Sequence, residues 1–250
     1  MKKKLIIISG IILLSAVGYY FIINYNPISA KVIAKEEVPE EVIRESKMNN
    51  VSEEDILFTS KSEARFKYNI SDNAVIKEKA DFIILGKIDS IDGAINYNST
   101  KNSYTFTKTI GELTVNKVIK GNLNEDKIPF IRAGGIINIE EYEKGLDDPL
   151  KAKLKLDNLS ENDKKTKYIK EIFSDDINLE ENKDYLMYLK YDPDYNKYAI
   201  NFLQYGLREI SIDTNVKQSY ATQNDMYSNL ENIKVKNNVT GQWEELNNII

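Results

Sequence analysis

Alternation of apolar and polar residues near the end of the chain constrains the fold most strongly, because a period of two is typical of a half-buried β-strand. One face of residues 184–191 collects Tyr185, Met187, Leu189 and Tyr191, and the other collects Leu186 and Tyr188. Residues 197–205 alternate in the same way, and residues 192–194 (Asp-Pro-Asp) supply a turn between them. We therefore predict a β-hairpin over residues 184–205.

Further strands are predicted on both sides of this hairpin. Residues 81–91 begin as an apolar run and then alternate, and Asp92-Gly93 follows as a turn signal before a polar loop at 94–103. Residues 104–120 form a long strand candidate in which Gly111 marks a bulge or bend. Shorter strands are expected at 127–132, with a continuation at 136–139, and at 207–212.

These elements predict a mainly β protein, a small antiparallel barrel of five to six strands. Residues 140–180 are a charged insertion that we expect to be partly helical, because Tyr168, Ile169, Ile172 and Phe173 recur at helical spacing. Closing a short sheet into a barrel removes its open edges. The expected domain organisation is residues 1–23 as a membrane segment, 24–70 as a linker, 71–213 as the barrel, and 214–250 as a C-terminal tail, partly helical or disordered.

The N-terminus reads as a membrane segment. Three lysines at positions 2–4 precede residues 5–23, an uncharged run that reaches about 28 Å as a helix, close to the roughly 30 Å of a bilayer core. We favour a retained single-pass anchor in the cell membrane with the rest of the chain outside. The alternative is a cleaved signal and a secreted product, although Ile28 is a poor residue for the nearest cleavage site, at 28–30.

Missing residue types exclude whole classes of chemistry. The chain has no cysteine and no histidine, so it lacks a thiol nucleophile, an imidazole base and the usual zinc ligands. Residues 24–250 keep 31 of the 34 basic residues and all 39 acidic ones, a net charge of −8. A surface this acidic does not suit a polyphosphate backbone, so nucleic acid is excluded as a partner.

Four segments carry a resemblance to a known group of proteins. Residues 118–123 (Val-Ile-Lys-Gly-Asn-Leu), Gly134-Gly135 and residues 181–189 follow one another in a pattern that resembles uncharacterised surface proteins and lipoproteins of Gram-positive-type bacteria, and residues 80–88 match its opening element. This resemblance covers about residues 72–213 and implies an OB-type barrel similar to the tissue inhibitors of metalloproteinases. Asn122 stands where the group usually has aspartate, and Asn182 where glycine is common. Inhibition through an N-terminal cysteine cannot be carried over to a chain without cysteine.

Acidic pairs are the remaining candidates for catalytic or metal-binding residues. The pairs and runs are Glu53-Glu54-Asp55, Glu140-Glu141, Asp147-Asp148, Asp175-Asp176, Glu180-Glu181, and Asp192 with Asp194. A two-carboxylate hydrolase needs acids that converge across a cleft, which adjacency in sequence does not provide. Calcium is a weak candidate at Asp147-Asp148 or Asp192/Asp194 because no Asp-x-Asp-x-Asp-Gly loop is present. We assign no catalytic, cofactor-binding or metal residue.

Tyrosines around the predicted hairpin form the candidate binding face: Tyr185, Tyr188, Tyr191, Tyr195, Tyr198 and Tyr205. Aromatic rings on an exposed sheet face can stack on sugars or bases, although alternation sends about half of these rings into the core. The leading hypothesis is a non-catalytic, membrane-anchored module that binds a surface protein or a cell-wall polymer. Alternatives are a carboxylate-dependent cell-wall hydrolase and a structural or stress-related envelope protein.

Overall fold

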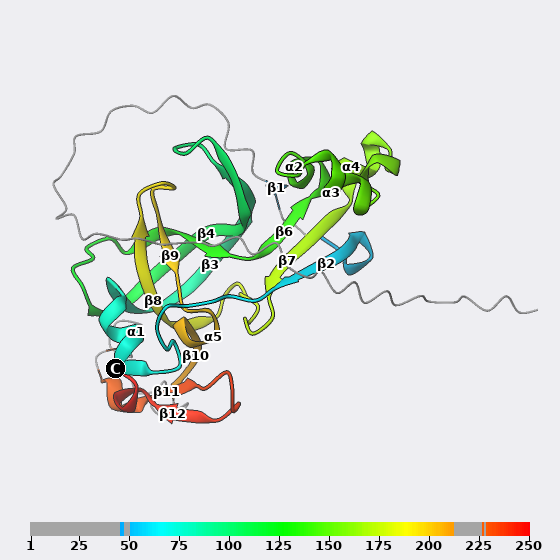
Figure 1. Ribbon diagram of the computed structural model, residues 1–250. Helices are drawn as coiled ribbons and strands as arrows, with labels where there is room; N and C mark the ends of the chain where they lie inside the picture. The colour runs from blue at the N-terminus through cyan, green and yellow to red at the C-terminus, as the bar shows by residue number, and fades with distance from the viewer. Residues whose placement is uncertain (1–45, 48–50, 213–226, 228) are drawn as a thin grey trace, which may run out of the picture. The chain divides into compact units, whose positions relative to one another are not determined.

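The computed structural model describes residues 46–47, 51–212, 227 and 229–250, all within the unit Val42–Ile250. These residues are mainly β, as the alternating patterns predict (Figure 1). The strands of the larger sheet, in pairing order, are β1 (Ser46–Lys47), β3 (Phe82–Asn98), β4 (Ser103–Lys120), β5 (Lys127–Ala133), β9 (Lys197–Ile200), β8 (Asp184–Asp192), β10 (Leu207–Ile212), β11 (Ile233–Lys236) and β12 (Trp243–Glu245). The smaller sheet has the order β2 (Ile56–Ser62), β7 (Tyr168–Phe173) and β6 (Gly135–Asn138).

Helices are short and lie between the strands. The α-helices are α1 (Asn73–Lys79), α2 (Ile139–Glu143), α3 (Asp148–Lys153), α4 (Glu161–Thr166) and α5 (Leu203–Gly206). The 3-10 helices are η1 (Glu53–Asp55), η2 (Leu156–Asn158), η3 (Leu230–Asn232) and η4 (Leu246–Asn248). Asp72 caps α1 by accepting a hydrogen bond from the Ala74 amide at 2.9 Å.

Five strands pair in a ring that closes on itself. β3 pairs with β4, β4 with β5, β5 with β9, β9 with β8, and β8 again with β3. The β5–β9 pair is parallel, while the other four pairs are antiparallel, so the ring is not the wholly antiparallel arrangement that short connections predict. Because every strand of the ring has a partner on both sides, these five strands leave no open edge.

The β3–β4 pair is longer than its sequence suggests. Asp92-Gly93 and residues 94–98 continue β3 and do not form a turn and loop, because pairing with β4 outweighs the local turn signal. The register shifts between Ile91 and Gly93, opposite Gly111. A Cβ on Gly111 would lie 2.1 Å from the Ser90 carbonyl oxygen, so a glycine is needed where the strands approach this closely.

Two apolar clusters occupy the two faces of the ring. The inner cluster takes side chains from all five strands, among them Ile84, Leu113, Phe130, Met187 and Ile200. The outer cluster covers the opposite face of β3 and β8 and also contains Ile76 of α1. Successive residues of β3 and β8 therefore alternate between two cores, which explains why both strands are nearly continuous apolar runs.

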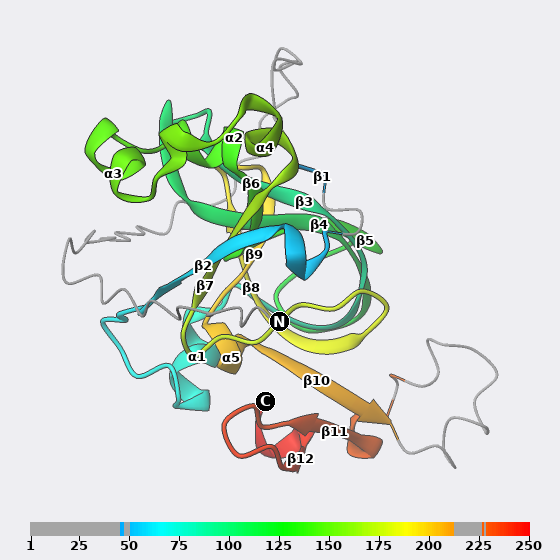
Figure 2. The same cartoon turned by 90° about the vertical axis from the view of Figure 1, so that its right-hand side faces the viewer.

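The described residues 229–250 complete the outer cluster with two strands and two 3-10 helices, where the sequence predicts a tail at 214–250 that is partly helical or disordered. β11 pairs with β10, and β12 pairs with β11 (Figures 1 and 2). Ile233, Val235, Leu246 and Ile249 are buried in that cluster. Ile233 and Val235 follow an alternating strand pattern that the prediction of a tail missed.

Two further predictions are wrong within the smaller sheet. Residues 56–62 belong to β2 and not to a linker, because they pair in parallel with β7. Residues 168–173 form β7 and not a helix, since they are paired on both sides, with β2 and with β6. The expected helical content of the insertion is present in α2, α3 and α4, which gather beside each other in Figure 2.

Buried charges stabilise the connections around the ring. Arg132 of β5 pairs with Asp176, and their side chains are only 5% and 8% exposed. The same segment carries Ile177 and Leu179, which pack against the inner cluster. Glu171 of β7 accepts a hydrogen bond from the Thr107 amide of β4 at 3.0 Å and so links the two sheets.

The proposed membrane segment, residues 5–23, lies outside the described residues. Within the part of the chain that the structure describes, no helix has the length and apolar character to cross a bilayer.

Candidate functional site

The structure separates the six tyrosines of the candidate binding face. Tyr185 is buried in the inner cluster and Tyr188 in the outer one, so neither ring is available to a ligand. Tyr205 packs beside the outer cluster. Tyr191, Tyr195 and Tyr198 lie near the turn of the β8–β9 hairpin, and the candidate site lies around this turn.

Three aromatic rings form a continuous ladder at this hairpin. Tyr191 and Tyr198 are directly paired across β8 and β9, with ring centroids 5.4 Å apart in an edge-to-face arrangement. Tyr198 then meets Phe82 at 5.5 Å, also edge to face. We call Phe82, Tyr198 and Tyr191 the aromatic ladder; Tyr191, at its outer end, is 40% exposed.

Two hairpin loops meet beside the ladder and hold it in place. Loop 99–102 joins β3 to β4, and loop 193–196 joins β8 to β9. Lys101 forms an ion pair of 2.5 Å with Asp194, and the Thr100 hydroxyl donates to the Asp194 carbonyl at 2.9 Å. In the ladder itself, the Tyr191 hydroxyl donates to Asn196 of the same loop. This loop junction fixes the position of Tyr191 before any ligand arrives.

Lys108 lies against the ring of Tyr195 in loop 193–196. The Lys108 ammonium is 5.2 Å from the centroid of the Tyr195 ring and donates to the Thr105 hydroxyl at 3.3 Å. The Thr105 and Tyr195 hydroxyl oxygens are 3.2 Å apart. Burial lowers the pKa of Lys108, and burial raises the pKa of Asp192 nearby. Lys108 is therefore a desolvated cation that contacts the Tyr195 ring of the hairpin turn.

Replacing Lys108 by methionine is expected to stabilise the protein below the folded-state pKa of this lysine. A base whose pKa is lowered by folding carries its full desolvation cost below that pKa, and the cost disappears as the pH rises toward the usual value. At pH 6 we expect Lys108→Met to raise the melting temperature by about 2–4 °C, the shift for roughly 1 kcal/mol in a domain of this size. The gain should shrink toward pH 10. Lys153→Met, at an exposed position of α3, is the control; a pH-independent gain in both variants contradicts the assignment.

The two acidic pairs that are candidates for calcium, Asp192/Asp194 and Asp147-Asp148, have structural partners. Asp192 accepts a hydrogen bond from the Asp194 amide at 3.1 Å, and Asp194 is held by Lys101, so this pair stabilises the turn. Asp147 caps α3 through the Leu150 amide. Among the residues whose positions are described, no group of three or more acids could hold a metal ion.

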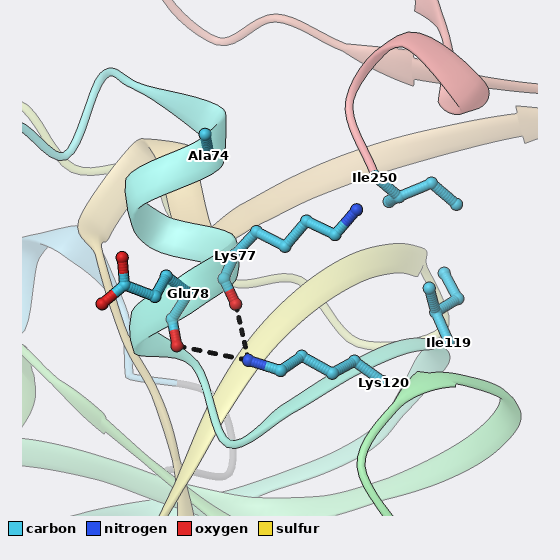
Figure 3. Close-up of a pocket in the computed structure, with 6 residues that line it drawn as sticks. All are labelled: Ala74, Lys77, Glu78, Ile119, Lys120 and Ile250. Carbon is cyan, nitrogen blue, oxygen red and sulfur yellow. Dashed lines mark hydrogen bonds between the residues drawn. The ribbon is translucent and has the colours of Figure 1, made fainter.

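A hollow of about 700 Å³ lies between the end of α1 and the C-terminal residue Ile250 (Figure 3). The Lys120 ammonium donates to the Lys77 and Ala80 carbonyls at 2.6 Å each and to the Glu78 carbonyl at 3.2 Å. Lys120 thereby satisfies the free carbonyls at the end of α1. Since this amine is already committed to the helix, the hollow is best explained as a junction between elements.

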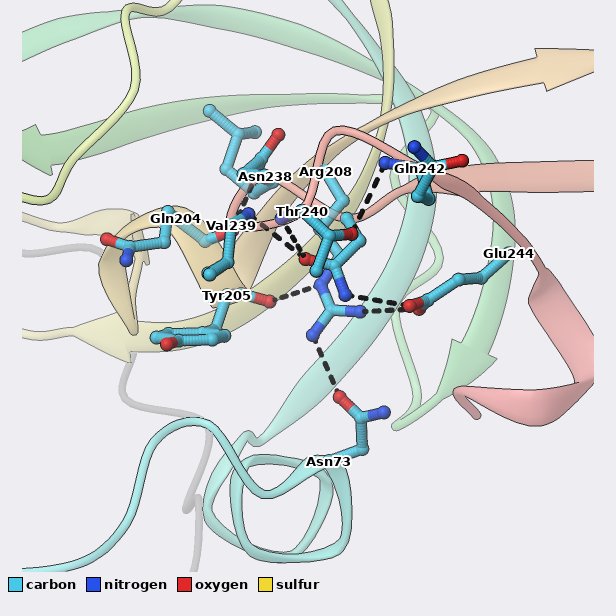
Figure 4. A network of polar contacts seen from close by, with 11 residues as sticks. Asn73, Gln204, Tyr205, Arg208, Asn238, Val239, Thr240, Gln242 and Glu244 are labelled. Carbon is cyan, nitrogen blue, oxygen red and sulfur yellow. Dashed lines mark hydrogen bonds and ion pairs between the residues drawn. The ribbon is translucent and has the colours of Figure 1, made fainter.

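A polar network links α1, α5 and the C-terminal strands (Figure 4). Buried Arg208 donates to the Tyr205 carbonyl at 3.0 Å and to the Asn73 side chain at 2.8 Å. Its guanidinium also lies 3.8 Å from a Glu244 carboxylate oxygen of β12. Asn238 donates to the Gln204 and Leu207 carbonyls. These bonds position the C-terminal segment, and their role is structural.

Phe82 and the partners of Asp194 are the site residues that sequence reasoning missed. Phe82 opens an apolar strand and looks like an ordinary core residue, and only the pairing of Phe82 with Leu189 brings it beside the hairpin. Thr100 and Lys101 lie in a polar loop with no catalytic spacing. The short loop of turn-forming residues at 193–196 was the available signal, since loops at one end of a closed sheet meet in space.

The chain matches no model of a known protein family, and it matches no curated protein. Its function is therefore inferred from the residues and their geometry.

Proposed function

We propose that this protein is a non-catalytic recognition module, anchored in the cell membrane through residues 5–23, that binds a cell-wall polymer outside the cell with its aromatic ladder. The single observation that carries this proposal is the exposed Tyr191 ring at the end of the three-ring ladder, beside a preformed loop junction. An exposed ring offers its face and edge to the C–H surface of a sugar, and Phe82 and Tyr198, which pack against the inner cluster, support Tyr191 from behind.

The topology of the ring supports the same site. We propose that β3, β4, β5, β8 and β9 are the five strands of an OB-type barrel, because their closing order is first, second, third, fifth, fourth, with the third and fifth parallel. Barrels of this type bind oligosaccharides and oligonucleotides with the loop between the first and second strands and the loop between the fourth and fifth. Those loops correspond here to 99–102 and 193–196, which form the junction.

The charge of the chain favours oligosaccharides over oligonucleotides as the ligand. Residues 24–250 carry a net charge of −8, which repels a phosphate backbone. A stacked ring needs no charge to bind a sugar. The proposed ligand is therefore a glycan strand of the wall, and a protein partner is the outcome that would replace it.

The expected result of Tyr191→Ala is a loss of wall binding of at least about fivefold, since a stacked ring contributes on the order of 1 kcal/mol or more. The measurement is co-sedimentation of the full chain, in detergent, with purified insoluble peptidoglycan. Tyr104→Ala is a closely matched control, because Tyr104 is 42% exposed and also pairs across two strands with a tyrosine, Tyr97. Equal losses in the two variants, or no binding by the unchanged protein, would overturn the proposal.

A further inference from the structure

Strand β2 has a strand partner on one side only. It pairs with β7, which lies between β2 and β6 in the smaller sheet (Figure 1). Among the described residues, no strand pairs with the outer edge of β2. An open edge presents a row of unpaired N–H and C=O groups and is a template for another strand. Because β2 shares no residue with the aromatic ladder, a partner at this edge goes beyond the proposed function.

One hydrogen bond identifies which main-chain groups of β2 face outward. The Ser62 carbonyl accepts from the amide of Ser174, just after β7, at 2.9 Å, so the main chain of Ser62 is directed toward β7. Main-chain direction alternates along a strand, and Ser60 therefore also faces β7. Thr59 and Lys61 face away from β7, and their N–H and C=O groups form the free edge.

Residues 58–62 are the regular part of this edge. The register between β2 and β7 shifts once, at a bulge on Leu57, and is continuous from there to the end of the strand. The regular part contains no proline, and Lys61 is its one charged residue. Proline and repeated charges are the usual means of blocking an open edge, so this one is accessible to a second strand.

Charges of opposite sign flank the two ends of β2. Residues 53–54, both glutamate, precede the strand. The basic residues at its end and beyond are Lys61, Arg65 and Lys67, and Glu63 is the one acid among them. All of these side chains belong to exposed residues, and none forms an ion pair with another described residue. An antiparallel copy of β2 therefore brings an acidic end beside each basic end.

Strand β12, at one end of the larger sheet, does not have this property. Its sequence is Trp-Glu-Glu, so pairing β12 with itself brings the glutamates of both copies together. Like charges on directly opposed strands are destabilising. The pattern at β2 is complementary to itself, which favours a second copy of this chain over an unrelated strand.

We propose that two copies of this protein form a symmetric dimer by antiparallel pairing of β2 with β2, centred on Ser60. Thr59 of each copy lies opposite Lys61 of the other, and each such pair exchanges two main-chain hydrogen bonds. The same patch is used by both copies, as two-fold symmetry requires. The pairing joins the two smaller sheets into one continuous sheet and removes the open edge of β2.

The absence of cysteine allows a single introduced thiol to report on this interface. Ser60 lies on the two-fold axis, at a pair without hydrogen bonds, where opposed Cα atoms are about 4.5 Å apart and a disulfide can form. The full chain carrying Ser60→Cys, in detergent at micromolar concentration, is oxidised mildly and analysed by non-reducing electrophoresis. Ser211→Cys is the matched control, because Ser211 is exposed in a strand, β10, and is already paired with Lys234.

We expect Ser60→Cys to give at least about tenfold more disulfide-linked dimer than Ser211→Cys, since only paired strands hold two thiols at a high effective concentration. Equal yields from the two variants, or no dimer from Ser60→Cys, would overturn the proposal. Tyr191→Ala should leave the crosslink unchanged, so this proposal and that of the aromatic ladder fail independently.

Charge reversal tests the complementarity of the two ends. Arg65→Glu/Lys67→Glu makes both ends of β2 acidic, and we expect it to lower the Ser60→Cys crosslink at least about fivefold, because like charges then meet. Adding Glu53→Lys/Glu54→Lys should restore the crosslink, which excludes a folding defect as the cause of the loss. A yield that the first pair leaves unchanged, or that the second pair does not restore, contradicts the antiparallel arrangement.

Discussion

Deletion of residues 229–250 is expected to unfold the protein. This segment buries Ile233, Val235, Leu246 and Ile249 in the outer cluster, where they cover the face of β3 and β8. Each fully buried aliphatic side chain contributes roughly 1.5–3 kcal/mol, so the segment supplies an amount comparable to the total stability of about 5–15 kcal/mol that is usual for a domain. Circular dichroism of the shortened chain should show no cooperative thermal transition.

Single substitutions test the contribution of the C-terminal segment to stability without deleting any residues. Leu246→Ala should lower the free energy of unfolding by about 2–5 kcal/mol, as expected for a buried leucine, whereas Val239→Ala in the exposed turn before β12 should change it by less than about 0.5 kcal/mol. A shortened chain that melts like the intact protein, together with a neutral Leu246→Ala, would show that the C-terminal segment does not belong to the core.

Removal of the Asp176 carboxylate should be nearly as damaging. The Arg132–Asp176 pair is almost completely buried, and the second terminal nitrogen of Arg132, Nη1, has no partner among the described residues. Asp176→Ala would leave a buried guanidinium without its counter-charge, which costs about 3–5 kcal/mol. Denaturant unfolding of the full chain in detergent should show this loss as a lower midpoint with a similar slope.

The double variant Arg132→Met/Asp176→Leu separates charge from packing. Replacing both partners of a buried ion pair by apolar residues of similar size is often neutral or stabilising. We therefore expect the double variant to recover most of the stability lost in Asp176→Ala, with a coupling free energy above about 1 kcal/mol in the double-mutant cycle. Additive losses would mean that the two side chains do not interact.

Strands with a period of two could be predicted from the sequence because local alternation specifies them. β4, β8 and β10 begin and end within one or two residues of the predicted bounds. β3 could not be delimited, because Asp92-Gly93 is a strong local turn signal and only pairing with β4 overrides it. Elements that depend on distant partners are the ones that sequence reasoning assigned incorrectly, as β2 and β7 show.

The helix predicted at residues 168–173 from the spacing of apolar residues is wrong for a related reason. Tyr168, Ile169, Ile172 and Phe173 fit a helix face, but over six residues the same residues also fit a strand. Here β2 and β6 provide partners on both sides, and the strand is favoured. At the C-terminus, Ile233 and Val235 are only two residues apart, a spacing that indicates a strand, and they are buried by cluster contacts that no local pattern reveals.

The candidate site could be found in part. The tyrosine-rich hairpin is present, and Tyr191 and Tyr198 face each other as the alternation implies. Alternation also predicts that some rings enter the core, and Tyr185 and Tyr188 do so. The contribution of Phe82 and the Lys101–Asp194 contact depend on strand register and on the meeting of two loops, and neither is encoded locally.

Site-specific photocrosslinking tests the central claim most directly. The full-length protein would carry p-benzoylphenylalanine in place of Tyr191, or in place of Tyr104 as the matched control, and be irradiated in intact source cells. We predict that the Tyr191 position yields an adduct that wall-degrading glycosidases release and proteases do not, while the Tyr104 position yields little. An adduct sensitive only to proteases, or the same glycan adduct at both positions, would contradict the account of the aromatic ladder as a surface that binds wall polymer.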